Sequence, residues 1–235
     1  WERGWSILQS GRKEFEELFS QIQERVFPTY NEEDILKLLR QRYFVILQGP
    51  PGTGKTRLAN NVLSNEFESR GKSIQFHPAT TYENFVIGIQ PNVSNKELSF
   101  SISNGYLIEA IIEAEGKKDY LLLIDEINRA DLGKVLGEAI ALFEYKEVKE
   151  GKSREVELPY KEIGLSKLKL PTNLFILGTM NSADRSIAIL DLAVRRRFAF
   201  VDIWPQKSVV DEQGIPLASE AFSKLLEIFI QYASE

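Results

Sequence analysis

The sequence has no cysteine and only one histidine, His77, among its 235 residues. Without cysteine there is no disulfide framework and no thiolate metal site, and a single histidine cannot form a histidine metal cluster. No apolar run approaches the roughly 18 residues that a membrane span needs, and no signal-peptide pattern opens the chain. These absences predict a cytoplasmic protein without a membrane segment. His77 lies just beyond a predicted strand and is expected to be a structural residue.

Basic residues are also in deficit, because 29 Lys and Arg face 34 Asp and Glu, for a net charge of -5. A domain whose main task is to hold a nucleic-acid backbone is usually basic. If DNA belongs to the function, we expect most of the DNA contact to come from elsewhere. The first residue is Trp1 rather than Met, which predicts a fragment of a longer protein.

From residue 43 onward, short apolar runs alternate with helical patterns. This alternation predicts an α/β fold with a central parallel sheet covered by helices on both faces. The predicted strands are 43–48, 73–76, 120–124, 173–178 and 198–203. The predicted helices are 55–70, 105–115, 132–145 and 187–196. Residues 146–170 break the rhythm, and a polar hairpin is predicted there, with 150–153 joining Lys146–Lys149 to Arg154–Leu158.

A complete phosphate-binding loop follows the first predicted strand. The motif G-x-x-x-x-G-K-[ST] is filled by the run Gly49, Pro50, Pro51, Gly52, Thr53, Gly54, Lys55 and Thr56, and Arg57 comes next. The strand before the loop and the helix after it are the context that the motif requires. Backbone N–H groups of such a loop, together with the positive end of the helix, hold phosphate oxygens. The sequence therefore predicts a nucleoside triphosphate site rather than a glycine-rich turn without a ligand.

Two adjacent carboxylates end the strand predicted over 120–124. Asp125 follows a buried run at the sheet edge where parallel sheets place their ligands, so it can hold Mg²⁺ together with the Thr56 hydroxyl. Glu126 comes next, and a carboxylate close to a γ-phosphate can orient and polarise the attacking water. A solvated acidic pair is the alternative, and the phosphate loop makes the catalytic interpretation the stronger one.

Two further features point to the same chemistry. Another apolar strand ends in Asn181, whose amide can bond both a water and a phosphate oxygen, and Asp184 or Ser186 is available to cap the helix after it. That helix ends in the run Arg195–Arg197. Cations favour a helix C-terminus, but one of these arginines can also reach the γ-phosphate bound by a neighbouring subunit.

Together these features resemble an AAA+ NTPase, and more specifically the McrB group. The resemblance rests on the segments 125–131 and 178–186, on Leu190-Asp191, on the run 195–198, and on Gln75-Phe76-His77-Pro78 with the residues behind it. It covers about residues 40–205. It divides the chain into an N-terminal helical leader (1–40), a nucleotide-binding core (41–205) and the start of an incomplete helical lid (206–235).

This resemblance implies a hexameric ring that hydrolyses GTP with Mg²⁺ and works with an McrC-type endonuclease subunit in DNA restriction. By the same resemblance, the loop binds the phosphates, Asp125 serves the metal and Glu126 activates water. Asn181 and Asp184 fall in a signature segment near the γ-phosphate, and Arg196 is the finger that acts in a neighbouring site.

The chain departs from the group in a few places. Ser182 stands where the group usually has Thr, which keeps the hydroxyl. We expect no DNA-recognition domain before residue 40 and no full lid after 205 in this sequence, which agrees with a fragment. The N-K-x-D guanine reader is absent as well, because Asn95-Lys96-Glu97-Leu98 lacks the aspartate, so the residues alone do not decide between GTP and ATP.

Three other functions fit part of the pattern. An ATP-driven remodelling protein of the MoxR type would differ in nucleotide preference and in its genetic neighbours. A non-hydrolysing scaffold would not need Glu126, Asn181 and the arginines. A P-loop small-molecule kinase would need neither the Asn-tipped strand nor an arginine acting between subunits.

Overall fold

The computed structural model describes residues 28–94, 97–115, 118–159, 167–182, 190–205, 210–211 and 214–233. The chain divides into two compact units. One comprises residues 30–202, and the other comprises residues 1–29 and 203–235. Within the described part of the second unit, the main element is α10 (Pro216–Ala233). No helix among the described residues is long and apolar enough to cross a membrane.

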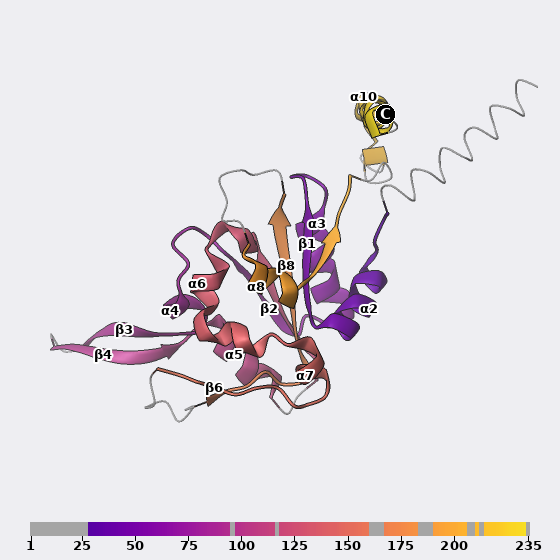
Figure 1. The fold of residues 1–235 in the computed structure, drawn as a ribbon. Coiled ribbons are helices and arrows are strands. Elements are labelled where there is room, and N and C mark those ends of the chain that lie inside the picture. Colours follow the sequence, from indigo (N-terminus) through magenta and orange to yellow (C-terminus); the bar gives the residue numbers. More distant parts are fainter. Residues whose placement is uncertain are drawn as a thin grey trace, which may run out of the picture. The chain divides into compact units, whose positions relative to one another are not determined.

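The core of the larger unit is a five-stranded sheet in the order β2-β5-β8-β1-β9, and every pairing in it is parallel. Its strands are β1 (Phe44–Gly49), β2 (Gly71–Gln75), β5 (Tyr120–Asp125), β8 (Leu174–Asn181) and β9 (Ala199–Asp202). Helices flank the sheet, as Figure 1 shows. The central strands are nearly continuous apolar runs because helices bury both of their faces. The predicted fold class is confirmed.

The helical elements join the strands in alternation. They are α2 (Glu32–Arg42), α3 (Lys55–Asn61) continued by the π-helical η1 (Val62–Glu66), α4 (Tyr82–Phe85), α5 (Tyr106–Ala114), the 3₁₀ turn η2 (Ile127–Arg129), α6 (Leu132–Leu136), the 3₁₀ helix η3 (Gly137–Leu142), α7 (Tyr145–Lys149) and α8 (Leu192–Arg197). The helix predicted over 132–145 is therefore α6 and η3 in succession. Gly137, at a φ of 51°, stands where one gives way to the other.

The α2 helix shows how local sequence sets an element. The Asn31 side chain accepts a hydrogen bond from the Asp34 N–H at 2.9 Å, and the Asp34 carboxylate accepts one from the Asn31 N–H at 3.2 Å. These reciprocal bonds satisfy two donors that the first turn leaves unpaired. Ile35 and Leu39, one turn apart, are buried against the core.

Aromatic side chains fill the core beneath one part of the sheet. The ring of Phe44 on β1 lies 4.8 Å from that of Phe143 and 6.0 Å from that of Phe198, measured between centroids. Tyr43 stacks on Phe175 of β8 at 4.9 Å. Such pairs contribute about 0.5–1.5 kcal/mol each beyond their buried area. They tie β1 to β8 and to the segments after η3 and α8.

The hairpin predicted between Lys146–Lys149 and Arg154–Leu158 is wrong. Residues 145–149 form α7, in which Val148 is fully buried. The strand after it, β6 (Val156–Glu157), pairs instead with β7 (Lys167–Leu168), and Val156 lies opposite Leu168. Because the run is mostly polar, the sequence did not reveal a helix in which one residue packs inward. The strand that pairs with β6 lies further along the chain, in β7.

A second hairpin was not predicted. It consists of β3 (Ile87–Ser94) and β4 (Glu97–Asn104), which pair antiparallel and extend away from the sheet in Figure 1. Ile89 lies opposite Ile102, and Pro91 lies opposite Phe100. The Phe100 side chain is 69% exposed. No helical segment separates β3, which ends at Ser94, from β4, which begins at Glu97, so the alternation of strands and helices used for the sheet did not reveal this hairpin.

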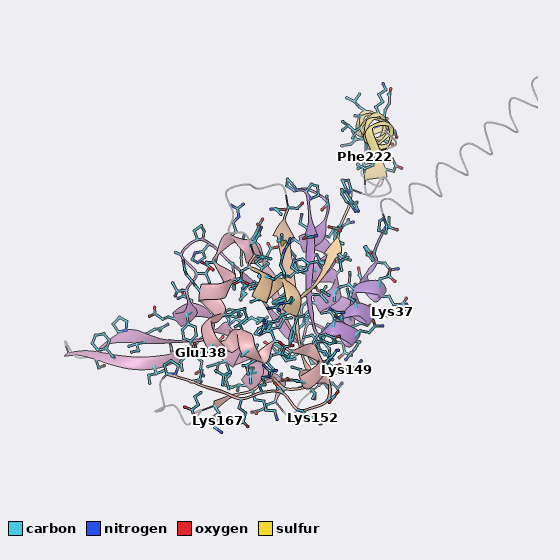
Figure 2. The ribbon with its side chains drawn as sticks, viewed as in Figure 1. Lys37, Glu138, Lys149, Lys152, Lys167 and Phe222 are labelled. Carbon is cyan, nitrogen blue, oxygen red and sulfur yellow. The ribbon has the colours of Figure 1, made fainter. Side chains whose placement is uncertain are left out.

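The outer elements carry charged side chains into solvent. Figure 2 labels Lys37, Lys149, Lys152 and Lys167 on the outside of the larger unit. Lys37 pairs with Glu33, Lys152 with Glu150 and Lys167 with Glu155, all as exposed ion pairs. Exposed pairs of this kind contribute about 0–1 kcal/mol each, so stability comes from the apolar interior.

Gly178 is a close-contact position in β8. A Cβ there would lie 3.1 Å from Cδ1 of Ile127 and 3.2 Å from Cγ1 of Ile46. Both isoleucines are fully buried, so neither can move away easily. The missing side chain lets β1 and the η2 turn pack closely on either side of this strand.

Candidate active site

The phosphate-binding loop joins β1 to α3. Gly52 and Gly54 adopt left-handed φ angles of 81° and 85°, which residues with side chains rarely reach. These two turns bring the loop back over the end of β1, so that Lys55 and Thr56 open the helix. Its backbone conformation is therefore the one that the motif predicts for a phosphate cradle.

Lys55 is only 6% exposed although it carries a charge. Its ammonium donates hydrogen bonds to the carbonyl oxygens of Gly49 at 3.0 Å and of Pro50 at 2.7 Å. Burial lowers the pKa of Lys55, and the nearby carboxylates of Glu126 and Asp125 oppose that shift. The loop thus holds a buried cation at the floor of a cavity.

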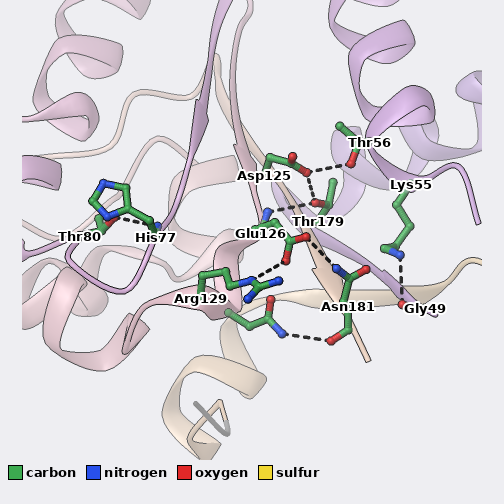
Figure 3. Close-up of polar contacts among 11 residues, drawn as sticks. Gly49, Lys55, Thr56, His77, Thr80, Asp125, Glu126, Arg129, Thr179 and Asn181 are labelled. Carbon is green, nitrogen blue, oxygen red and sulfur yellow. Dashed lines mark hydrogen bonds and ion pairs between the residues drawn. The ribbon is translucent and has the colours of Figure 1, made fainter. Parts of the chain in front are cut away.

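Asp125 ends β5 and lies between two hydroxyl groups, as Figure 3 shows. Thr56 Oγ1 donates to Asp125 Oδ1 at 2.9 Å, and Thr179 Oγ1 donates to the same oxygen. Thr56 comes from the loop and Thr179 comes from β8, so the carboxylate is fixed from two elements. This arrangement brings together the two residues predicted to hold a metal.

Glu126 turns the chain at the end of β5. It adopts a left-handed conformation, with φ 52° and ψ 45°, which costs a residue with a side chain about 1–2 kcal/mol. Its backbone N–H donates to Thr179 Oγ1 at 3.2 Å, and its carbonyl oxygen accepts the N–H of Arg129 at 2.9 Å. The turn aims the Glu126 carboxylate at the edge of the sheet where β8 ends.

The Glu126 carboxylate is held by two further side chains. Asn181 Nδ2 donates to Glu126 Oε1 at 2.7 Å, and Arg129 Nε donates to Glu126 Oε2 at 3.3 Å. Asn128, which is 3% exposed, donates from Nδ2 to the backbone oxygen of Asn181 at 3.2 Å. These contacts join the ends of β5 and β8 and keep Asn181 beside the predicted base.

A cavity of about 450 Å³ opens beside these groups. It is lined by loop residues, by Arg57 at the start of α3, and by side chains from β5 and β8. The lining residues are Pro51, Gly52, Gly54, Lys55, Thr56, Arg57, Glu126, Thr179 and Asn181. Its cationic floor, left-handed loop and amide donor suit the phosphates of a nucleotide.

The donor set also fits Mg²⁺. Thr56 Oγ1 and Asp125 Oδ1 are oxygen atoms 2.9 Å apart, and Mg²⁺ takes oxygen ligands while keeping places for water and phosphate. Among the described residues, no three His, Asp or Glu side chains gather as an all-protein metal site. These residues therefore suit a cation that takes some of its ligands from the phosphates of a bound nucleotide.

The predicted arginines lie on α8, and none of them lines the cavity. Arg197 donates to the Ala193 carbonyl at 2.8 Å and pairs with Glu144 at 3.4 Å. The Arg195 guanidinium lies 5.9 Å from the Phe200 ring centroid. Arg196 is exposed and, within the part of the chain that the structure describes, its side chain makes no hydrogen bond or ion pair. Asp184 lies outside the described residues.

Three residues at the site were not among the predicted site residues, namely Thr179, Asn128 and Arg129. Thr179 could have been noticed, because it is a hydroxyl residue in an apolar strand and lies two positions before Asn181, on the same side of β8. The contacts of Asn128 and Arg129 depend on the geometry of the η2 turn, and the sequence pattern did not predict that geometry.

Comparison with known proteins identifies the class. The family model described as "AAA domain (dynein-related subfamily)" matches residues 44–198. A 122-residue stretch is 29% identical to cytoplasmic dynein heavy chain of Saccharomyces cerevisiae, covering 50% of this chain and 3% of that one. The chain belongs to this AAA family.

Within the family the chain is McrB-like, as the sequence resemblance predicted. It is 36% identical to the EcoKMcrB subunit of a type IV methyl-directed restriction enzyme of Escherichia coli K12, over 91% of this chain. It is 26% identical to the YdiS component of the type II restriction enzyme BsuMI of Bacillus subtilis, over 77% of this chain. The chain spans 47% and 63% of the lengths of these two relatives.

The lowered pKa of Lys55 predicts how stability depends on pH. Between that pKa and the ordinary 10.5, the unfolded chain binds more protons at this residue than the folded chain does. The contribution of Lys55 to the free energy of unfolding therefore rises with pH in that window. We measure the free energy of unfolding in urea from about pH 8 to 11. The wild-type value minus the Lys55→Met value is expected to increase up to pH 10.5.

Lys72 is the matched control, because its hydrogen bond to Glu109 raises its pKa. The stability that Lys72 contributes is fully present below 10.5 and is lost as the pH rises through its folded pKa. The free energy of unfolding of the wild type minus that of Lys72→Met should therefore stay level and then fall as the pH rises. If the corresponding difference for Lys55→Met also falls with pH, burial does not lower the pKa of Lys55.

Proposed function

We propose that this chain is the GTP-hydrolysing, Mg²⁺-dependent motor subunit of a DNA restriction complex, acting as a hexameric ring with an McrC-type endonuclease subunit. One observation carries the proposal. The phosphate loop, Glu126 and Asn181 meet in a single cavity at the carboxyl edge of the sheet, and Asp125 is bonded to Thr56 at its side. These are the parts that hydrolysis of a triphosphate requires.

In this proposal the loop and Lys55 bind the phosphates. The Lys55 ammonium exchanges its bonds to the Gly49 and Pro50 carbonyls for bonds to β- and γ-phosphate oxygens. Thr56 and Asp125 would hold Mg²⁺, which would offset the negative charge of the phosphates. The close pairing of these two oxygens, at 2.9 Å, supports their assignment to one ion.

Glu126 is assigned the role of general base. Its carboxylate orients a water and accepts a proton from it as the oxygen of that water bonds to the γ-phosphorus and the bond to the β-phosphate oxygen breaks. The Asn181 amide donates to the same carboxylate at 2.7 Å, so it lies where it can also bond a γ-phosphate oxygen. This proximity supports a shared role for Glu126 and Asn181 at the reacting water.

The restriction role rests on relatives and on charge. The E. coli relative is a subunit of a methyl-directed restriction enzyme, and the B. subtilis relative is a component of another restriction enzyme. GTP follows from the resemblance to the McrB group. A net charge of -5 supports assigning DNA contact to the complex rather than to this chain.

The arrangement of α8 supports Arg196 as the finger. Arg197 is engaged by Ala193 and Glu144, and Arg195 lies against Phe200. Arg196 keeps its guanidinium exposed at the end of the helix. An exposed, uncommitted arginine is the kind that can enter a phosphate site on a neighbouring copy.

Nucleotide competition tests the choice of GTP. A fluorescent GTP analogue bound in the presence of Mg²⁺ should be displaced by GTP at lower concentrations than by ATP. Lys55→Met should lose binding of the analogue, because the only buried cation among the lining residues is removed. If ATP displaces the analogue better than GTP, the remodelling ATPase of the MoxR type replaces the present proposal.

Replacing Glu126 by Gln tests the base. Gln keeps the size and the bond to Asn181 but cannot take a proton, so hydrolysis should fall by about 10²–10⁴ while nucleotide affinity stays near that of the wild type. Phosphate release and nucleotide titration measure the two effects. Glu150→Gln, which alters only an exposed pair with Lys152, is the control and should change neither. Unchanged turnover in Glu126→Gln would remove this residue from the chemistry.

Mixing two inactive variants tests the finger. Arg196→Ala should lower hydrolysis in the assembled ring by about 10³–10⁵ without changing nucleotide affinity. Glu126→Gln is also inactive but keeps Arg196. If the finger acts between copies, mixed rings regain turnover, because some sites combine an intact base with an intact arginine. Full activity of Arg196→Ala alone, with loss in Arg195→Ala, would transfer the role to Arg195.

A further inference from the structure

Thr179 is a buried hydroxyl at the centre of the site. It lies on β8, whose neighbours are β5 with the two acidic residues and β1 with the phosphate loop. It is 2% exposed, and its hydroxyl is within hydrogen-bond distance of both Asp125 Oδ1 and the Glu126 backbone N–H. Figure 3 shows this one side chain between the two acids.

The chemistry of the partners fixes the direction of both bonds. A backbone N–H can only donate, so the Thr179 oxygen must accept from Glu126. An ionised carboxylate can only accept, so the single hydroxyl proton must point to Asp125 Oδ1. With its proton on Asp125 and one lone pair accepting from Glu126, the hydroxyl is held in one orientation. It links the side chain of one acid to the main chain of the next.

Each bond constrains a different property of the site. At Asp125, Thr179 and Thr56 share one oxygen, but Thr179 comes from a strand buried in the sheet rather than from the loop. At Glu126, the bond secures the N–H of a residue in the left-handed region, where the turn would otherwise relax. The same hydroxyl thus sets the rotamer of the metal-side carboxylate and the direction of the base.

We propose that Thr179 is a positioning residue for the reaction, setting Mg²⁺ affinity through Asp125 and turnover through Glu126. This inference rests on the proposed function and deepens it. Thr179 does not touch the reacting atoms in this role. Outer partners of metal ligands typically change metal affinity or activity by about 10–100-fold when they are removed.

Two substitutions separate the hydroxyl from the shape of the side chain. Thr179→Val keeps the branched shape and removes both hydrogen bonds. Thr179→Ser keeps the hydroxyl and removes only the methyl group. The measurements on the purified protein are the Mg²⁺ concentration that gives half-maximal hydrolysis, the turnover at saturating Mg²⁺, nucleotide binding in EDTA, and thermal unfolding.

For Thr179→Val we expect the half-saturating Mg²⁺ concentration to rise about tenfold and turnover at saturating Mg²⁺ to fall about 10–100-fold. Nucleotide binding in EDTA should not change, because the phosphate loop is untouched. Thr179→Ser should restore both hydrolysis parameters to near wild-type values. If Thr179→Val does not fold, Thr179→Cys replaces it, because a thiol is only a weak donor and acceptor, and the same direction of change is expected.

Wild-type parameters in Thr179→Val would overturn the proposal. Equal losses in Thr179→Val and Thr179→Ser would overturn it too, because they would assign the effect to packing of the methyl group. Lack of Mg²⁺-dependent turnover in the wild-type protein would instead refute the proposed function, and this inference with it. If the wild-type protein shows Mg²⁺-dependent turnover but Thr179→Val and Thr179→Ser do not differ from each other, only the inference about Thr179 is refuted.

Discussion

The parallel pairing of β8 with β5 on one side and β1 on the other is the constraint on which the site depends. It sets Gly178 opposite Ile124 and Asn181 opposite Gly49, so the carboxyl ends of all three strands reach the same edge. Each strand delivers one kind of group there: an acid pair, an amide and a phosphate loop. A shift of β8 by one residue in register would place Thr179 and Asn181 on the opposite face of the sheet, away from the acid pair and the phosphate loop.

The site keeps charge and strain inside a well-packed frame. Lys55 is buried against backbone carbonyls, and Glu126 adopts a left-handed conformation. Each of these features alone is unfavourable. The Glu126 N–H donates to Thr179, and the Asn181 amide donates to the Glu126 carboxylate, and these bonds hold the turn at Glu126. The apolar strands and aromatic rings behind the turn supply most of the favourable burial. Local cost at the edge is offset by packing at the centre.

The sequence predicted most of the sheet and the residues of the phosphate loop because short runs of consecutive residues determine both. Apolar runs marked the strands, and a linear motif marked the loop. The carboxyl ends of parallel strands meet at one edge of a sheet. The sequence could therefore place Asp125, Glu126 and Asn181 at that edge. Thr179 was missed because its role depends on the register between strands. The β6–β7 pairing was missed because the sequence pattern favoured the run 146–149, rather than residues 167–168, as the partner of the second strand. The roles of the predicted site residues, including Asp184 and Arg196, remain predictions.

Gly178 has a consequence for how this sheet can vary among related proteins. A methyl group there would meet both Ile46 and Ile127, at little more than 3 Å. Relatives that carry alanine or a larger residue at this position should therefore carry smaller residues at position 46 or 127, so the three positions should change together. Because both neighbours are buried side chains, a substitution at Gly178 depends on how far Ile46 and Ile127 can give way or be replaced by smaller residues.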